Sequence, residues 1–407
     1  MILRGISSSL LAKFLGPVLG FGTIGLISEL YGPGEVGLYS SLMQLIIVLG
    51  VFSRAGSDFV LMKSLSNFST GATNVWIIKK ILPIFVVALF LTLSLVLVIF
   101  DYFDWPIFNV LVNQRYLVIY CVGISSIYVF ALSILIARNS YLASTVLQSI
   151  ITPAAILLSI FCLSYVESSL LVTISLGYSI SLLACVLYIW INLGCFESRS
   201  TVMPSGYSSG LSVSISEAVF YNSDLLILSF YVPFADLGVY AIATRLATLY
   251  GFYVQISNIA IIGDVSSMIK YGEKASLASF KRAFIKRNFL FGALYVVALL
   301  SSACIVPMLI GEEYSMVFDY ALWLSLPGFL GCLYGSTSNF RFLFSDSANK
   351  RDGHINMVFM VLYGIIFLYV TSKLGVDGAI MTVVLLKSIY YVSFNLRLNR
   401  VIETYAY

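Results

Sequence analysis

The stretch from Ile81 to Phe100 reads ILPIFVVALFLTLSLVLVIF and contains no charged residue. A helix needs about 20 apolar residues to cross a hydrocarbon core of about 30 Å. Similar continuous runs recur along the chain, whereas a membrane β-barrel would show weakly alternating segments of about ten residues. The sequence therefore predicts an all-α membrane protein.

The composition of the whole chain supports the same fold class. The 407 residues are 60% hydrophobic and only 10% charged, against roughly 25% charged residues in a soluble domain. The polar stretches between the apolar runs are too short to bury a core of their own. The six cysteines are scattered, and there is a single histidine. We therefore expect no catalytic residues, metal site or cofactor, and no nucleic-acid partner.

The apolar runs divide into about twelve predicted spans. We place them at 10–30, 38–54, 78–100, 116–137, 141–164, 169–193, 209–231, 237–262, 288–310, 317–340, 354–372 and 377–397. With the N-terminus in the cytoplasm, 19 of the 23 Lys and Arg residues fall on the cytoplasmic side. Only Arg115 and Lys373 fall outside, and Arg245 and Lys387 lie within spans. Such a bias is typical of the positive-inside rule and predicts that both termini are cytoplasmic.

A sequence pattern repeats at half the chain length. The first copy reads YGPGEVGLYS from Tyr31, and the second reads YVPFADLGVYA from Tyr231. Proline ends one helix, and the following acid and glycine favour a tight turn into the next. Because both copies follow an odd-numbered span, the repeat is parallel. We predict two six-helix lobes, 1–193 and 209–407, joined by a cytoplasmic linker at 194–208. A pseudo-two-fold axis along the membrane normal relates them, with a central site between them.

Ionisable residues inside the predicted spans are candidate site residues, because a charge at mid-bilayer is retained only at a cost. They are Glu217, Asp224, Arg245 and Lys387. Depth along neighbouring antiparallel helices predicts an Asp224–Arg245 contact, either a structural ion pair or a cavity pair that opens for an anionic substrate. Lys387 is either a second anion contact or a snorkelling cation. Glu217 is a candidate carrier for a coupled proton.

Two further residues complete the candidate site. Matching the two hairpins on their tyrosines aligns Arg245 with Gln44, so both lobes would present a polar group at similar height. Pro17 follows Gly16 in the first span and is our candidate hinge, since proline kinks membrane helices. Tyr221, Tyr250 and Tyr253 are weaker candidates for stacking on sugar faces.

These motifs resemble a known family. The segments LGP at Leu15–Pro17 and YGPGEVGLYS from Tyr31, followed by NSDLLIL from Asn222 and LGVYAIATRL from Leu237, are similar to bacterial polysaccharide-biosynthesis flippases. These belong to the multidrug/oligosaccharidyl-lipid/polysaccharide exporter superfamily. The segment GVDGA from Gly375 resembles the family's C-terminal turn.

The resemblance implies a twelve-helix transporter that is not an enzyme and lies in the bacterial inner membrane. It implies an undecaprenyl-pyrophosphate-linked oligosaccharide as substrate, an O-antigen or capsule repeat unit of lipopolysaccharide or polysaccharide biosynthesis. Membrane lipids, a polysaccharide polymerase and a chain-length regulator would be its partners. The alternatives are a cation-coupled multidrug exporter of the same superfamily and an O-antigen polymerase. The polymerase is disfavoured because no large outer loop is available for catalysis.

Overall fold

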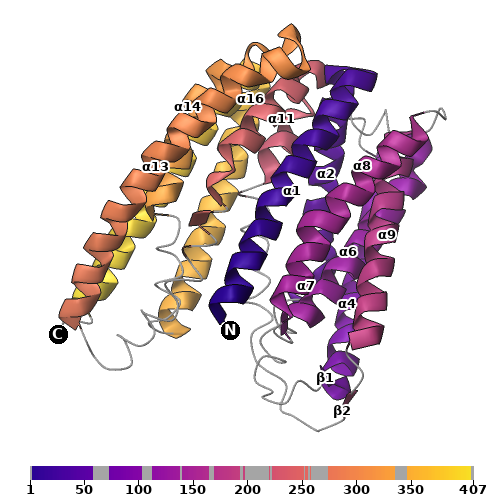
Figure 1. Ribbon diagram of the computed structural model, residues 1–407, viewed down its shortest axis with the longest axis horizontal. Helices are drawn as coiled ribbons and strands as arrows, with labels where there is room; N and C mark the ends of the chain where they lie inside the picture. The colour runs from indigo at the N-terminus through magenta and orange to yellow at the C-terminus, as the bar shows by residue number, and fades with distance from the viewer. Residues whose placement is uncertain are drawn as a thin grey trace. The chain divides into compact units, whose positions relative to one another are not determined.

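The computed structural model describes residues 2–57, 73–102, 112–137, 140–164, 169–192, 196–197, 220, 222–251, 253–254, 257, 274–334 and 346–404. These residues are mainly helical, as the sequence predicts (Figure 1). A two-residue parallel pair, β1 (Thr73–Asn74) with β2 (Phe196–Glu197), is the exception among them. The chain divides into two compact units, Met1–Phe230 and Tyr231–Tyr407.

The first unit is a helical bundle. Its elements are α1 (Ile2–Tyr31), α2 (Pro33–Arg54), α4 (Val75–Tyr102), the 3₁₀ turn η1 (Val112–Gln114), α6 (Arg115–Ala137), α7 (Tyr141–Val146), the π-helical segment η2 (Leu147–Ile151), α8 (Thr152–Leu163) and α9 (Leu170–Asn192). Helix α6 packs on α9 and α2, and α8 packs on α9 and α1. These packed faces hold the core of the unit, including Ile24, Leu42 and Ile174.

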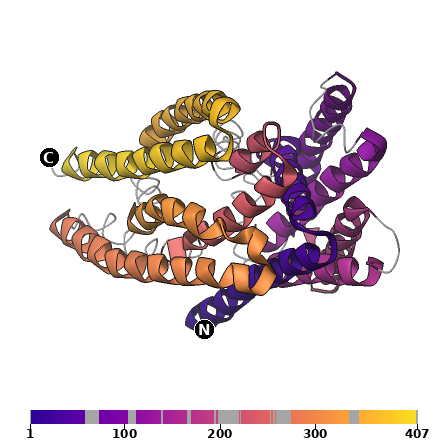
Figure 2. The ribbon, with the colours of Figure 1, turned by 90° about the horizontal axis from the view of Figure 1, so that it is seen from above.

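The second unit contains fewer described elements. They are α11 (Phe234–Ala247), α13 (Lys274–Ile310), the 3₁₀ turn η3 (Glu312–Tyr314), α14 (Val317–Tyr334) and α16 (Asp346–Thr404). Helix α16 is two helical arms that meet at Gly375, whose φ of 59° and ψ of −134° are not helical. The arms fold back on each other, with the Phe359 and Tyr390 ring centroids 5.2 Å apart (Figure 2). Helix α14 packs on α13, α16 and α11.

The protein is a multi-pass membrane protein by the length and composition of these helices. In the described part of the chain, 8 helices are long and apolar enough to cross a membrane, one of them counted across the Gly375 kink. Helix α4 leaves Val87, Phe90 and Leu91 58%, 69% and 61% exposed within the protein. Such an apolar surface is stable against the hydrocarbon of a membrane but not against water. The count of twelve spans, the pseudo-two-fold axis and the cytoplasmic termini stay predictions.

The turn and helix start predicted for each copy of the repeat form in the structure. Gly32 adopts a φ of 86°, which favours glycine, and Pro33 then begins α2 with Glu35 in its first turn. In the second copy Pro233 precedes α11 and Asp236 lies in the first turn. An acid there stabilises the helix, because its negative charge interacts favourably with the positive end of the helix dipole. The prediction from the proline–acid–glycine pattern is confirmed for these two turns.

One predicted span is part of a longer helix, and another is interrupted. Helix α13 begins at Lys274, ahead of the predicted span at 288–310, so the helix extends beyond the predicted membrane segment. The predicted span 237–262 is interrupted, since α11 ends at Ala247 and a turn follows. The apolar run alone carries no signal for this break. The lobe boundary at 193–209 falls on residues that the structure leaves mostly undescribed and stays a prediction.

The π-helical segment η2 has a local cause. Pro153 has no amide hydrogen, so it cannot bond to the Ser149 carbonyl as an α-helix requires. The backbone hydrogen bonds therefore change from the α-helical i to i−4 pattern to the π-helical i to i−5 pattern, and the Thr152 amide donates to the Leu147 carbonyl. A Cβ on Gly16 would lie 2.9 Å from the Ser149 carbonyl oxygen. Gly16 therefore serves close packing of α1 on η2, and the helix runs continuously through Pro17. A hinge at Pro17 stays a prediction.

Candidate functional site

A cation and a group of hydroxyls meet inside the first unit, where α2 ends against α6. The Ser53 and Ser126 hydroxyl oxygens are 2.5 Å apart. A Cβ placed on Gly50 would lie 3.3 Å from Nη1 of Arg54 and 3.6 and 3.7 Å from the hydroxyl oxygens of Ser126 and Ser125. The half-buried guanidinium of Arg54 therefore folds back over Gly50, a residue that Ser125 and Ser126 also approach. We call Arg54, Ser53, Ser125 and Ser126 the arginine–serine cluster.

The backbone explains why Arg54 takes this place. Helix α2 stops at Arg54 because Ala55 adopts a left-handed φ of 47° and Gly56 follows at 73°. Such a turn ends many helices, although alanine there is strained relative to glycine. Ser57, just beyond the turn, is fully buried, and its hydroxyl has no hydrogen-bond partner among the described residues. A buried polar group without a partner is rare in native proteins and suggests a bound water or ligand.

The arginine–serine cluster has the chemistry of an anion site. A guanidinium presents five N–H donors and pairs well with the oxygens of phosphate. The hydroxyls of Ser53, Ser125 and Ser126 are already hydrogen-bonded to backbone carbonyls or to each other, so the donors for an anion come from Arg54. Sequence analysis used Arg54 only as a topology signal and did not predict this cluster. A glycine one turn before the arginine, at Gly50, was the available signal, because it leaves room for the guanidinium.

A second polar cluster lies within the second unit, on the second arm of α16. Lys387 is 6% exposed there, and Tyr391 lies one turn further along the same helical face. The Tyr391 hydroxyl is hydrogen-bonded to the hydroxyl of Tyr250, and the two rings meet edge to face at 6.2 Å. The predicted cation Lys387 is therefore buried one helical turn from the tyrosine pair, and its two predicted roles, anion contact and snorkelling cation, stay predictions.

The interruption after α11 is stabilised by neighbouring side chains. The Tyr295 hydroxyl donates to the Ala247 carbonyl at 2.5 Å, the last residue of α11. Tyr253 donates to the Asn288 side-chain oxygen at 2.5 Å. Breaks of this kind within the membrane are tolerated where protein groups satisfy the freed backbone. Tyr250 and Tyr253 thus use their hydroxyls inside the unit, and their stacking on sugar faces stays a prediction.

The Tyr250–Tyr391 contact gives a stability prediction. We expect Tyr250→Phe and Tyr391→Phe each to lower the free energy of unfolding by about 1 kcal/mol, because each leaves one buried hydroxyl short of this partner. The double variant should cost less than the sum of the two, since both hydroxyls then disappear. Unfolding midpoints of the four purified proteins in detergent measure this coupling. Strictly additive losses would mean that the hydroxyl pair contributes nothing.

The remaining predicted site residues lie as follows. Asp224 is 4% exposed in the helical segment 222–228, and its Oδ1 accepts the Leu225 amide at 2.9 Å. Arg245 is half-buried in the last turn of α11. The Asp224–Arg245 contact would join the first unit to the second and stays a prediction. The Gln44 side-chain oxygen is buried and has no hydrogen-bond partner within the described residues. Glu217 lies outside them.

The described part of the chain contains no candidate metal site. No group of three or more His, Cys, Asp or Glu residues gathers there with the spacing to hold an ion. Two separate polar clusters are therefore the site features, one around Arg54 and one around Lys387.

Comparison with solved structures identifies the fold. The chain is similar to the lipid II flippase MurJ in its inward closed conformation, with a TM-score of 0.73 at 16% identity, over 98% of this chain and 88% of that one. It is also similar to a multidrug resistance MATE family transporter of the MOP superfamily. The outward-facing form gives 0.62 at 13% identity over 99% and 96% of the chains. The inward-facing form gives 0.64 at 15% identity over 98% and 99%.

At this level of identity the likeness establishes the fold. No protein-family model matches the sequence, and no curated protein matches it. The chain therefore has the fold shared by the MurJ flippase and the MATE transporters, both of which are transport proteins.

Proposed function

We propose that this protein is a flippase of the bacterial inner membrane. Its substrate is an undecaprenyl-pyrophosphate-linked oligosaccharide, an O-antigen or capsule repeat unit, which it moves from the cytoplasmic to the periplasmic leaflet. Two lobes of six helices rock against each other around a central site to give alternating access. A polysaccharide polymerase and a chain-length regulator act on the exported unit.

The observation that carries this proposal is the arginine–serine cluster. A pyrophosphate cannot cross hydrocarbon unaided, because a desolvated charge is costly there. The half-buried guanidinium of Arg54, over Gly50, supplies N–H donors that replace part of its water. Lys387 and Arg245 add cations within the second unit. The similarity of the fold to MurJ, whose printed name is a lipid II flippase, supports a lipid-linked substrate.

A multidrug exporter is the second candidate, and a specific observation favours it. Asp224 is a buried carboxylate, the kind of group that binds a coupling cation or a cationic drug, and the fold also resembles MATE transporters. The two functions differ in the charge of the substrate. The flippase needs Arg54 and Lys387 for an anion, whereas the exporter needs Asp224 for a cation.

Deletion of the gene in its host tests the proposal directly. We expect loss of surface polysaccharide, together with accumulation of complete lipid-linked repeat units on the cytoplasmic leaflet. The units are identified by mass spectrometry, and their sidedness is measured by the access of a sugar-specific probe to spheroplasts. The wild-type gene should restore export.

Complementation separates the two candidates. Under the flippase proposal, Lys387→Ala and Arg245→Ala fail to restore surface polysaccharide, and the deletion strain keeps its ordinary resistance to cationic drugs. The exporter would replace the flippase if the deletion strain kept normal polysaccharide but became sensitive to cationic drugs, and if the wild-type gene restored resistance while Asp224→Asn did not. Exported but unpolymerised units would point to a polymerase.

A further inference from the structure

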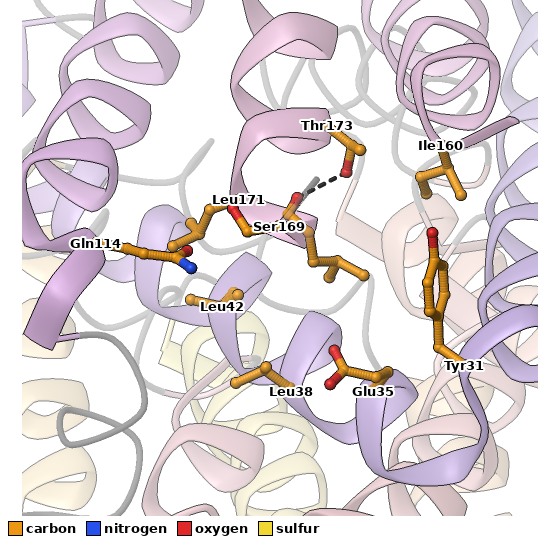
Figure 3. Close-up of a pocket in the computed structure, with 10 residues that line it drawn as sticks. Tyr31, Glu35, Leu38, Leu42, Gln114, Ile160, Ser169, Leu171 and Thr173 are labelled. Atoms are coloured by element: carbon orange, nitrogen blue, oxygen red, sulfur yellow. Dashed lines mark hydrogen bonds between the residues drawn. The ribbon is translucent and has the colours of Figure 1, made fainter. Parts of the chain in front are cut away.

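A cavity lies at the end of the first unit where the α1–α2 turn meets η1 and the start of α9. Its volume is about 260 Å³. Ten residues line it: Tyr31, Glu35, Leu38, Leu42, Gln114, Ile160, Ser169, Leu170, Leu171 and Thr173. With the predicted spans and a cytoplasmic N-terminus, the α1–α2 turn, η1 and the start of α9 all fall at the outer side of the membrane. Figure 3 shows the carboxylate of Glu35 and the amide of Gln114 directed into the cavity from different sides.

Glu35 is the charged group of the cavity. It is half-buried, and within the described residues neither a hydrogen bond nor an ion pair engages its carboxylate. No lysine or arginine is among the ten lining residues. An acid in the first turn of α2 also serves the helix dipole, but that role needs no cavity. Asp236 lies in the first turn of α11 in the same way. Replacing it therefore serves as a control for the helix-dipole effect without the cavity.

The other lining groups restrict what fits. Thr173 already donates its hydroxyl hydrogen to the Leu170 carbonyl at 2.6 Å. The carboxylate of Glu35, the amide oxygen of Gln114 and the hydroxyl of Ser169 remain as three acceptors on different elements. An ammonium group carries one positive charge and three donors. The apolar walls formed by Leu38 and Leu42 suit the carbon skeleton beside it, and the volume suits a group smaller than a drug-sized ligand.

We propose that this cavity, the Glu35 cavity, binds a group that carries a primary ammonium. An amino sugar and the headgroup of an ethanolamine phospholipid both present that chemistry. The ammonium pairs with Glu35 and donates to Gln114 and Ser169. The inference is independent of the proposed substrate of the transporter.

Direct binding to purified protein tests the proposal. Isothermal titration in detergent uses glucosamine and ethanolamine as probes, with glucose as the neutral match for glucosamine. Thermal unfolding in nanodiscs compares phosphatidylethanolamine with phosphatidylcholine, whose quaternary ammonium has no N–H donor. We expect glucosamine or ethanolamine to bind at least tenfold more tightly than glucose. We expect Glu35→Gln to remove that preference and Asp236→Asn to leave it unchanged.

The outcomes divide cleanly. If glucosamine alone binds, the ligand is an amino sugar. If phosphatidylethanolamine alone stabilises the protein, and does so only with Glu35 present, the ligand is the lipid headgroup. Either result supports the proposal. Glu35→Asp keeps the charge and should keep the preference, which covers the case in which Glu35→Gln does not fold. The proposal is overturned if glucose binds as tightly as glucosamine at the same site, if Glu35→Gln leaves binding unchanged, or if no probe gives a response. Loss of polysaccharide export is scored separately and does not bear on these results.

Discussion

Replacing Arg54 by alanine is expected to lower export of the lipid-linked substrate about 10- to 150-fold. That range corresponds to about 1.5–3 kcal/mol for hydrogen bonds to a charged group. The guanidinium lies beside Ser125 and Ser126 in a partly buried setting, where an anion has little water to compete with the pairing. Transport of a fluorescent lipid-linked oligosaccharide in proteoliposomes, at substrate concentrations below saturation, measures the effect.

Two control variants separate binding from folding and from topology. Arg54→Lys keeps the charge but loses the forked geometry, so we expect an intermediate loss. Arg287→Ala removes an exposed cation from α13, on the same predicted side of the membrane, and should leave transport unchanged. Equal losses in Arg54→Ala and Arg287→Ala would mean that the arginine–serine cluster has no special role. Unchanged transport by a folded Arg54→Ala protein would remove the cluster from the proposed site.

Replacing Gly177 by alanine is expected to lower the stability of the first unit by about 1–3 kcal/mol, the range typical of overpacking. A Cβ at Gly177 would lie 3.0 Å from the Cα and 3.1 Å from the backbone nitrogen of Ile156. Because these are backbone atoms of α8, the contact is relieved only by moving α8 away from α9. The unfolding midpoint of the purified protein in detergent measures the loss.

Gly123→Ala is the matched control for this variant. Gly123 also lies within a membrane helix, α6, but a Cβ there would meet nothing within 4 Å. Alanine favours a helix over glycine by up to about 1 kcal/mol, so we expect the midpoint of Gly123→Ala to stay the same or rise. Equal midpoints for both variants would contradict the close α8–α9 contact.

Helix positions were largely predictable because they depend on local sequence. The run from Ile81 to Phe100 has no stable alternative to a membrane helix, since each backbone polar group must be satisfied within the segment. The turns at Gly32–Pro33 and at Pro233 were also predictable, because proline and glycine restrict the backbone wherever they occur. By contrast, the end of α11 at Ala247 depends on Tyr295, which is distant in sequence.

The candidate site was predictable in part. Lys387 and Asp224 are buried, as a charge within an apolar run suggests. Arg54 and Lys281 were counted only among the cations of the predicted cytoplasmic side, yet Arg54 lies over Gly50 near two serines and Lys281 is only 7% exposed. The sequence places these cations near helix ends but carries no sign of which neighbouring helix will cover them.

The sequence by itself determined that this chain is a helical membrane protein built with two proline–acid hairpins, because hydrophobic length and backbone restriction are local properties. Tertiary structure alone decided that Ser53 meets Ser126, that Arg54, Ser125 and Ser126 gather around Gly50, that Tyr250 meets Tyr391, and that Glu35 opens into a cavity. Most of these contacts join residues far apart in the chain. They form because packing at glycines and the relative rotation of helices bring the side chains together, and no local pattern encodes that rotation.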